Sequence, residues 1–468
     1  MNVKEIDTMN TQMNRRRFLN GALITTLCAG PFVECTYAAP PATPEKAMFS
    51  VYGDWQIQVN KGSANLGGKK ITIKKTTRLD VLPPALIHVT SERWDALPDY
   101  APNAAPWGRG ARLKQLDTFE TTAADMLVPA SLALRLKPGD ADTLTPGKDY
   151  DFEPKWATVG LKPGSRATGK PVYIDYDCGW FRIDSITIDK HGALRIIAGV
   201  PHRATPFPPR VSEGEHVIAN VWVPGRLVKL ETDNVFPIIE PEYPSIAHRG
   251  TPKAAAQLPE TWKKISSGTP FKVMAWGDSV TAGGQASDPA HQYQSVFIDK
   301  LKAKYPNCRP ELVTVGWGGR NTDSFLIEPV GAQYNFDSAV IAQKPDLIIM
   351  EFVNDAYMTP EVVEQKYSYL LSRFKAIGAE LIVLTPHFVR PDWMGKTSVR
   401  VEEDPRPYTA GVREFCAKHN IAIADAALRW GHLVKEGIPY TTLLSNSINH
   451  PDDRGHVLFA DAIMEVFE

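Results

Sequence analysis

Residues 273–284 have the sequence VMAWGDSVTAGG, an apolar run that ends abruptly at Gly277, Asp278 and Ser279. The apolar run predicts a buried strand, and the small residues after it predict a turn. An acid and a hydroxyl at the end of a strand have two interpretations. They cap a turn or a helix, because both side chains accept hydrogen bonds from unpaired backbone N–H groups. Alternatively, Ser279 is a nucleophile at the carboxyl edge of a sheet, where open α/β proteins bind their ligands.

The segment around this stretch predicts an α/β domain. From residue 268 onward, helical patterns alternate with the apolar runs FKVMAW, ELVTVGW, DLIIMEFV, ELIVLTP and IAIAD. Strands that are apolar on both faces and separated by helices indicate a parallel sheet covered on both sides, and right-handed crossovers place their carboxyl ends at one edge. We therefore predict a three-layer α/β/α, flavodoxin-like parallel sheet over residues 268–468. Helices are expected around Tyr293–Tyr305, Phe336–Gln343, Glu361–Ile377, Thr409–His419 and Arg454–Phe467.

The preceding part of the chain predicts an all-β, sandwich-like accessory domain over residues 47–240. Apolar residues recur there at every second position in short runs, with Gly and Pro between the runs. This pattern is typical of half-buried antiparallel strands. Residues 241–267 are rich in Pro, Ala and charge and have no periodic apolar face, so we predict a linker.

Composition narrows the class of protein. A chain of 468 residues is longer than one core usually supports, so two domains are expected. The formal net charge of -1 argues against nucleic-acid binding and favours a small or neutral partner. Cys178, Cys308 and Cys416 lack the spacing of metal ligands, and we expect at most one disulfide among them. The oligomeric state stays open.

Residues 1–39 predict an export signal. Arg15, Arg16 and Arg17 precede a short apolar stretch, and small residues at Thr36 and Ala38 offer a cleavage site. The pattern resembles a twin-arginine signal of bacterial exported proteins. Because the apolar stretch is shorter than the ~20 residues that span a bilayer, we expect no stable membrane insertion and a periplasmic or secreted product. A basic tail without structure is the alternative.

Polar residues and glycines follow other predicted strands at the same edge of the sheet. The sequence VGWGGRNT contains Gly318 and Gly319, where the backbone can approach a ligand closely. Asn354 follows the next strand, and His450 lies in the loop SINHPDDRGH before the last helix. We expect these residues to converge on Ser279.

The blocks GDSV, GWGGRNT, VND and NHPDDRGH, in this order, resemble those of the GDSL esterase family, also called SGNH hydrolases. By this resemblance Ser279 is the nucleophile and His450 the base. The same resemblance makes Gly319 and Asn354 oxyanion donors, together with the Ser279 backbone. The roles suit the residue types, because a serine hydroxyl needs an imidazole to accept its proton and the oxyanion needs preorganised neutral donors.

The sequence departs from the family pattern at one position. The family usually has an Asp three residues before the histidine, and Ser447 occupies that place here. The imidazole is then expected to be oriented by a neutral group or a backbone carbonyl. Asp453 stands three residues before His456 and satisfies the spacing superficially, but Gly455 and His456 fit the start of the final helix. If His456 were the base, the assignment of His450 would fail.

Two further residues have open roles. His387 and Arg390, with Trp393, follow the fourth predicted strand and either line the substrate pocket or are structural. The remaining histidines show no metal-ligand pattern, and no phosphate-binding loop or intact dinucleotide motif occurs. We expect neither a metal nor a cofactor.

The sequence therefore predicts an exported serine esterase. We expect it to remove acetyl groups from a polysaccharide, because an export signal and a β-domain of a kind that often binds glycans accompany the hydrolase blocks; the second reason is an analogy. The alternatives are a lipase or thioesterase and, because the usual carboxylate is missing, a decayed hydrolase kept as a glycan-binding module.

Overall fold

The computed structural model describes residues 44–244 and 252–468, which belong to one compact unit. The predicted export signal at residues 1–39 lies outside the described residues. The described unit comprises a β-rich region (residues 44–244) and an α/β region (residues 252–468). The predicted domain boundaries remain predictions, because both regions belong to this one unit.

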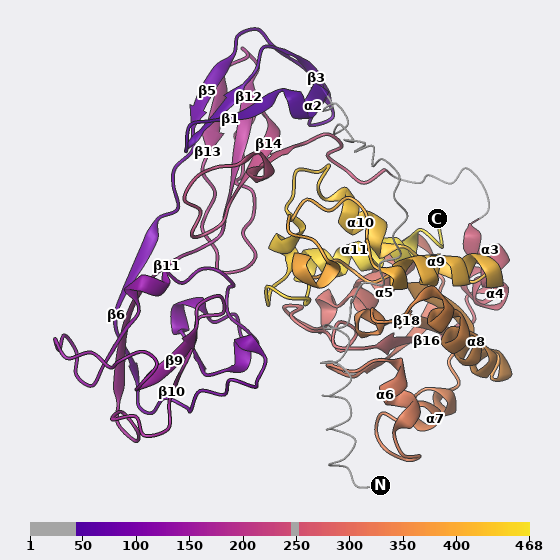
Figure 1. Cartoon of the computed structure of the whole chain (residues 1–468). Helices are drawn as coiled ribbons and strands as arrows, with labels where there is room; N and C mark the ends of the chain where they lie inside the picture. The colour runs from indigo at the N-terminus through magenta and orange to yellow at the C-terminus, as the bar shows by residue number, and fades with distance from the viewer. Residues whose placement is uncertain (1–43, 245–251) are drawn as a thin grey trace, which may run out of the picture. The chain divides into compact units, whose positions relative to one another are not determined.

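One parallel sheet organises the α/β region (Figure 1). Its strand order is β17-β16-β18-β19-β20, the flavodoxin-like order 2-1-3-4-5, which confirms the predicted fold. All four neighbouring pairs are parallel. The strands are β16 (Pro270–Gly277), β17 (Arg309–Gly316), β18 (Leu347–Glu351), β19 (Glu380–Leu384) and β20 (Ala422–Ala424).

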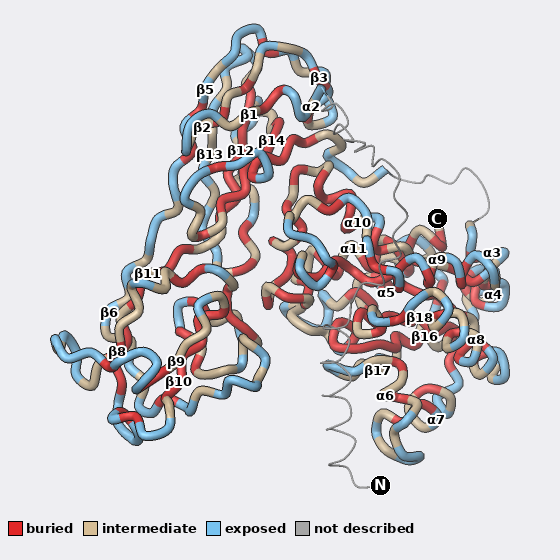
Figure 2. Tube along the Cα trace, viewed as in Figure 1, coloured by how far each residue is buried: buried red, intermediate tan, exposed pale blue. Residues whose placement is uncertain are grey.

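Both faces of the central strands are covered, and successive side chains of a strand point to opposite faces of the sheet. On β16, Val273 and Ala275 join one hydrophobic core, and Met274 and Trp276 join the other. Strands β16 and β18 are accordingly buried in Figure 2. The central strands therefore hold their carboxyl ends rigidly.

The helices divide between these two cores. The first core includes residues of α3 (Lys253–Gln257), α4 (Pro259–Ser267), α5 (Tyr293–Lys304), α10 (Ala426–His432) and α11 (Asp453–Met464). The second includes residues of α6 (Thr322–Ile327), α7 (Phe336–Ala339), α8 (Pro360–Ala376) and α9 (Pro407–His419). Together with the sheet they form the three predicted layers.

Part of the predicted linker is helical. Helices α3 and α4 begin after Pro252 and Leu258, and Leu258 and Ile265 are buried in the first core. The few apolar residues of this segment are spaced to face the sheet, although charged residues around them hide a periodic pattern. Residues 245–251 lie outside the described part of the chain.

The β-rich region consists mostly of antiparallel strands, as predicted, and these form several small sheets. The sheet orders are β1-β2-β5, β3-β4, β6-β11-β8, β7-β10-β9 and β13-β12-β14-β15. The elements are α2 (Pro44–Ala47), β1 (Phe49–Tyr52), β2 (Gln56–Val59), β3 (Gly62–Leu66), β4 (Lys69–Ile73), β5 (Thr77–Asp80), β6 (Leu86–Trp94), β7 (Ala111–Arg112), β8 (Ala133–Arg135), β9 (Tyr150–Glu153), β10 (Thr158–Leu161), β11 (Val172–Gly179), β12 (Arg182–Asp189), β13 (Leu194–Ile197), β14 (Glu215–Val223) and β15 (Val235–Pro237).

Residues of the two regions contact each other within the compact unit. Trp222 and Phe236 cluster with Val434, and the Asn220 side chain donates a hydrogen bond of 2.9 Å to the Gly437 carbonyl. Asn220 is buried, so this bond satisfies polar groups that water does not reach. The β-rich region is thus packed against the segment that leads to His450.

Cys178, Cys308 and Cys416 are buried and free. Burial raises the pKa of the Cys416 thiol to about 12, which keeps it protonated and unreactive. Within residues 44–244 and 252–468, no helix has the length and apolar character needed to cross a bilayer.

Candidate active site

The turn after β16 carries Ser279. A Cβ on Gly277 would collide with Thr281 and with the backbone of Glu351, so the end of the strand closes tightly. The Asp278 side chain is buried and accepts hydrogen bonds from the backbone N–H groups of Val280, at 3.1 Å, and Asn354, at 2.9 Å. Asp278 therefore orders the turn and ties it to the end of β18.

Ser279 and His450 meet at this edge of the sheet. The distance between Ser279 Oγ and His450 Nε2 is 2.8 Å. The loop that carries His450 is folded around Asn446, whose side-chain oxygen accepts hydrogen bonds from the N–H groups of Ile448, Asn449 and His450 at 2.9–3.0 Å. A hydroxyl and an imidazole from distant parts of the chain are thus held at hydrogen-bonding distance.

The predicted oxyanion donors belong to two loops that adjoin the turn of Ser279. A Cβ built on Gly318 would be 3.9 Å from Ser279 Cβ, so this loop passes close to the nucleophile. Gly319 has a φ of 70°, a conformation that favours glycine. The Asn354 side-chain amide donates a hydrogen bond of 3.1 Å to the Arg320 carbonyl. Asn354 is therefore bonded both to the turn that carries Ser279 and to the glycine loop.

A residue that sequence analysis missed contacts the other side of the imidazole. The carboxylate of Glu120, in the β-rich region, lies 2.5 Å from His450 Nδ1. The two atoms are in close contact, although Nδ1 forms no hydrogen bond of good angle in the described part of the chain. Burial raises the pKa of Glu120, but contacts with His450, Asn446 and Gln285 outweigh burial and leave the pKa below its usual value.

Three carboxyl groups lie buried below the site. Burial raises the pKa of Asp278 to about 6 and that of Asp355 to about 7, although hydrogen bonds from backbone N–H groups oppose both shifts. Burial, with repulsion from Asp278, also raises the pKa of Glu351 well above its usual value. Asp355 accepts hydrogen bonds from Thr322 and from the Tyr367 hydroxyl. These groups support the loops of the site from beneath.

His387 is fully buried, with its Nε2 2.5 Å from the Asn449 carbonyl oxygen. Burial lowers the pKa of His387 to about 3, so its ring is neutral and donates this hydrogen bond. This placement favours a structural role beside the His450 loop. Arg390 pairs with Asp392, and its backbone N–H donates to the Ile448 carbonyl at 2.7 Å.

His456 and Asp453 occupy separate surroundings. His456 is buried and accepts a hydrogen bond of 3.2 Å from the Tyr293 N–H, and burial lowers its pKa to about 4. The Asp453 carboxylate accepts from Ser287. Across the described ranges, Ser279 Oγ is hydrogen-bonded to His450, and neither of these two residues contacts it.

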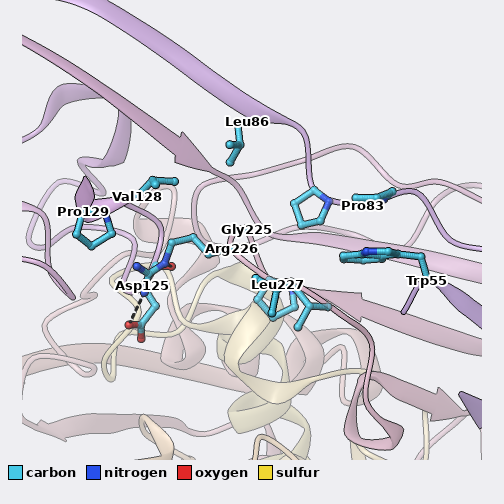
Figure 3. Close-up of a pocket in the computed structure, with 12 residues that line it drawn as sticks. Trp55, Pro83, Leu86, Asp125, Val128, Pro129, Gly225, Arg226 and Leu227 are labelled. Atoms are coloured by element: carbon cyan, nitrogen blue, oxygen red, sulfur yellow. Dashed lines mark hydrogen bonds and ion pairs between the residues drawn. The ribbon is translucent and has the colours of Figure 1, made fainter. Parts of the chain in front are cut away.

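Two of the cavities that involve the described part of the β-rich region are large enough for a small ligand. One of about 720 Å³ is lined by Trp55, Pro83 and Leu86, among others, and its polar members Asp125 and Arg226 pair with each other (Figure 3). A second of about 430 Å³ is lined from both regions and includes Trp222, Arg390 and Ser447. Neither is lined by Ser279 or His450, so we assign the site from the chemistry of its residues and not from cavity size.

Residues 275–458 match the model of the GDSL-like lipase/acylhydrolase family. This part of the chain is a GDSL-like lipase/acylhydrolase domain. The match confirms the resemblance and places the domain among the carboxylic ester hydrolases. No curated protein matches the sequence. In the described part of the acylhydrolase domain and of the β-rich region, no cluster of His, Cys, Asp and Glu is arranged to hold a metal ion.

Solved structures similar to this chain include three esterases or hydrolases. A two-domain esterase (CEX) active on acetylated mannans has 17% identity and a TM-score of 0.37, covering 45% of this chain and 52% of its own. Axe2, an acetylxylan esterase from Geobacillus stearothermophilus, has 20% identity and a TM-score of 0.33, and the match covers 42% of this chain and 94% of Axe2. LAE5, an α/β hydrolase from the metagenome of Lake Arreo, Spain, has 23% identity and a TM-score of 0.33, and the match covers 42% of this chain and 94% of LAE5. The present chain thus spans about half the length of the mannan esterase.

Proposed function

We propose that the protein is a serine esterase that removes acetyl groups from a neutral polysaccharide. The observation that carries this proposal is the 2.8 Å contact between Ser279 Oγ and His450 Nε2 at the carboxyl edge of the sheet. In a domain of the acylhydrolase family, a serine paired with an imidazole is the arrangement that acyl transfer requires.

The first half of the reaction forms an acyl-enzyme. Ser279 Oγ attacks the carbonyl carbon of the ester while His450 Nε2 takes the hydroxyl proton. The electron pair of the carbonyl bond moves to its oxygen, and the N–H groups of Ser279 and Gly319 with the Asn354 amide stabilise that oxyanion. Each such donor is worth about 3–4 kcal/mol in the hydrolases where one was removed. The oxyanion then collapses and expels the sugar oxygen, which receives the proton from His450.

The second half releases the acid. A water molecule gives a proton to His450 and attacks the acyl carbon, and the same donors hold the second oxyanion. Its collapse breaks the bond to Ser279 Oγ, and His450 returns the proton to that oxygen. Acetate leaves, and the serine hydroxyl is restored without a metal or cofactor in any step.

Aromatic residues near the His450 loop support a carbohydrate substrate. The Trp107 ring lies 5.3 Å from that of Trp156 and 6.0 Å from that of Trp393, and Trp393 is 50% exposed. The Arg390 guanidinium lies 4.9 Å from the Trp156 ring centre. Trp156 and Arg390 are buried, so Trp107 and Trp393 are the partly exposed rings, and such aromatic faces suit the apolar C–H groups of a sugar. The net charge of -1 fits a neutral polymer.

Export supports the same substrate class. The twin-arginine pattern around Arg15, Arg16 and Arg17 would carry the protein to the periplasm or beyond, where polysaccharides are found. Cell fractionation of a chain with Arg16 and Arg17 replaced by Lys tests this part separately: we expect the exported form to disappear.

The proposal is tested by labelling and by turnover. We expect a fluorophosphonate to label wild-type protein and not Ser279→Ala, and we expect Ser279→Ala to lower kcat for a short acetyl ester by about 10⁴-fold or more with its fold intact. Acetylated mannans and acetylxylan, named for two of the similar structures, are the first polymers to assay.

Two outcomes would contradict the proposal. A protein that cleaves long-chain p-nitrophenyl esters but releases no acetate from polysaccharides is a lipase or thioesterase. A protein whose Ser279 resists the fluorophosphonate, and which binds glycans without turnover, is a binding module.

A further inference from the structure

The position that usually carries the orienting carboxylate supplies none here. Ser447 has a φ of 56°, and its hydroxyl is buried without a hydrogen-bond partner in the described part of the chain. Ser447 lines the cavity that also contains Arg390. An imidazole that must accept and return a proton works poorly unless its other nitrogen is held in one tautomer by a partner. The partner of His450 has to come from elsewhere.

The β-rich region brings a carboxylate to that nitrogen. The Glu120 oxygen lies 2.5 Å from His450 Nδ1, on the side of the ring opposite the nitrogen that faces Ser279. The side chain of His450 is 11% exposed and that of Glu120 35%, so the imidazole is shielded from water and the carboxylate is partly exposed. A Cβ on Gly284 would lie 3.1 Å from Nδ1, and this glycine thus lets the backbone pack against the ring.

A tight turn holds Glu120 in this place. Thr118 and Thr121 close the turn through a backbone hydrogen bond of 3.0 Å, and Phe119 at its tip has a φ of 80°. A bulky residue with positive φ is strained, and such strain persists only where surrounding contacts enforce it. Here Thr121 Oγ donates to the Asn446 carbonyl at 2.5 Å, and Asn446 Nδ2 donates to the Glu120 carboxylate at 3.1 Å.

Asn446 therefore links the two sides of the site. Its side-chain oxygen folds the His450 loop, while its Nδ2 group and its carbonyl oxygen bind the Glu120 turn. Asn446 is buried, and breaking one of these bonds would leave a polar group without a partner. The loop of the base and the turn of the carboxylate are built as one unit.

We propose that Glu120 is the positioning residue of the esterase, so that the β-rich region completes a Ser279–His450–Glu120 arrangement. This inference rests on the proposed function. The carboxylate keeps the proton of neutral His450 on Nδ1, leaves Nε2 free to accept the serine proton, and stabilises the imidazolium that forms. The β-rich region then serves the chemical step itself and not only the binding of a polymer.

The test removes the negative charge of the Glu120 side chain and keeps its volume. We expect Glu120→Gln to lower kcat by about 10²–10⁴-fold with KM almost unchanged, because positioning acts on the chemical step. Losing the negative charge disfavours the imidazolium, so the acidic limb of the pH profile of kcat/KM should move to lower pH by about one unit. Asp278, His387 and His456 also act on His450 electrostatically, but they are the same in both proteins.

Two variants serve as controls. Asp117→Asn removes a carboxylate three residues away that pairs with Arg112, and we expect its kcat and pH profile to match those of the wild type. Glu120→Asp keeps the charge in the same turn, so its acidic limb should stay with the wild type even though its kcat falls. Thermal unfolding of each variant reports whether the fold is retained.

The outcomes separate this inference from the proposed function. If Ser279→Ala abolishes turnover while Glu120→Gln keeps kcat within about threefold and the wild-type pH profile, Glu120 is only a structural contact and the inference is overturned. An acidic limb that moves equally in Glu120→Asp and Glu120→Gln also overturns it, since charge would then not matter. If Ser279→Ala retains full activity, the proposed function itself fails.

Discussion

The two regions use β-strands in opposite ways. The α/β region has one parallel sheet whose central strands are buried on both faces, and each strand is followed by a helix that covers it. The described part of the β-rich region spreads its strands over five sheets of two to four strands, and its buried side chains are divided among several smaller cores. The parallel sheet holds the carboxyl ends of its strands rigidly at one edge, whereas the small antiparallel sheets are joined by many turns. The site takes its nucleophile from the rigid edge and, in our proposal, its carboxylate from a turn.

The regions also treat their acidic residues differently. In the α/β region Asp278, Glu351 and Asp355 are buried, and burial raises the pKa of each. In the β-rich region Asp142 is exposed and Glu215 is half-buried, and hydrogen bonds from Arg166 and Arg195 lower their pKa values. The stability contributed by these three buried carboxyl groups is therefore lost as the pH rises, whereas that of the two pairs with arginine is lost as the pH falls.

The contrast between the two regions is tested most strongly by removing one histidine from each and comparing the loss of stability. His387→Ala should cost about 3–4 kcal/mol in the free energy of unfolding, because it leaves a cavity beside Trp430 and Phe459 and deprives the Asn449 carbonyl of its donor. The matched change His88→Ala removes an exposed pair with Asp177 and should cost less than about 1 kcal/mol. Urea unfolding measures both. Unchanged stability with a raised KM in His387→Ala would mean that His387 reaches the substrate.

A pair of glycine substitutions sharpens the contrast in packing. Gly277→Ala should cost about 2–3 kcal/mol, because the new Cβ meets Thr281 and the Glu351 backbone at the rigid edge of the sheet. Gly108→Ala adds a Cβ with open space around it and should stay within about 0.5 kcal/mol of the wild type. Thermal unfolding measures both variants. An equal loss of stability in Gly277→Ala and Gly108→Ala would show that the edge of the sheet can relax around the new Cβ.

The smallest effect concerns pH. With the pKa of Asp355 raised from 3.8 to about 7 by burial, folding binds a proton between these values, so stability is lost as the pH rises from about 4 to 7. Asp355→Asn should reduce the loss between pH 5 and pH 7.5 by about 2 kcal/mol, since the amide keeps the contacts with Thr322 and Tyr367 and does not titrate. Asp142→Asn should instead reduce the loss on acidification, because its carboxylate has a lowered pKa. Urea unfolding between pH 5 and pH 7.5 measures the first effect, and unfolding below about pH 4 measures the second. Equal pH dependence of the wild type and Asp355→Asn between pH 5 and pH 7.5 would contradict the shift.

The fold of the α/β region was predictable because its signals are local. Apolar runs such as those of β16 and β18 and the helical period of α8 lie within single segments, and the order of the sheet follows from the rules of parallel crossovers. Helices α3 and α4 were not predicted, since only a few residues such as Leu258 and Ile265 mark their buried face. Short helices that depend on tertiary packing leave a weak pattern.

The site was predictable only in part, because only some of its residues carry a local sequence signal. Ser279, Asn354 and His450 follow predicted strands or precede a helix, so the topology alone brings them to one edge. Glu120 has no such marker, because it lies in the turn DTFETT, where Phe119 takes a positive φ without Gly or Asn to announce it. Its contact with His450 depends on how two regions pack, which no local pattern encodes.

The spacing of these residues along the chain also has a temporal consequence. During synthesis Glu120 leaves the ribosome first, Ser279 follows, and His450 comes later. Because α11, which follows His450 in the chain, packs into the first core, the loop that carries His450 reaches its place only once this helix has docked. A nascent polypeptide that has not yet folded α11 therefore carries Ser279 without the imidazole beside it.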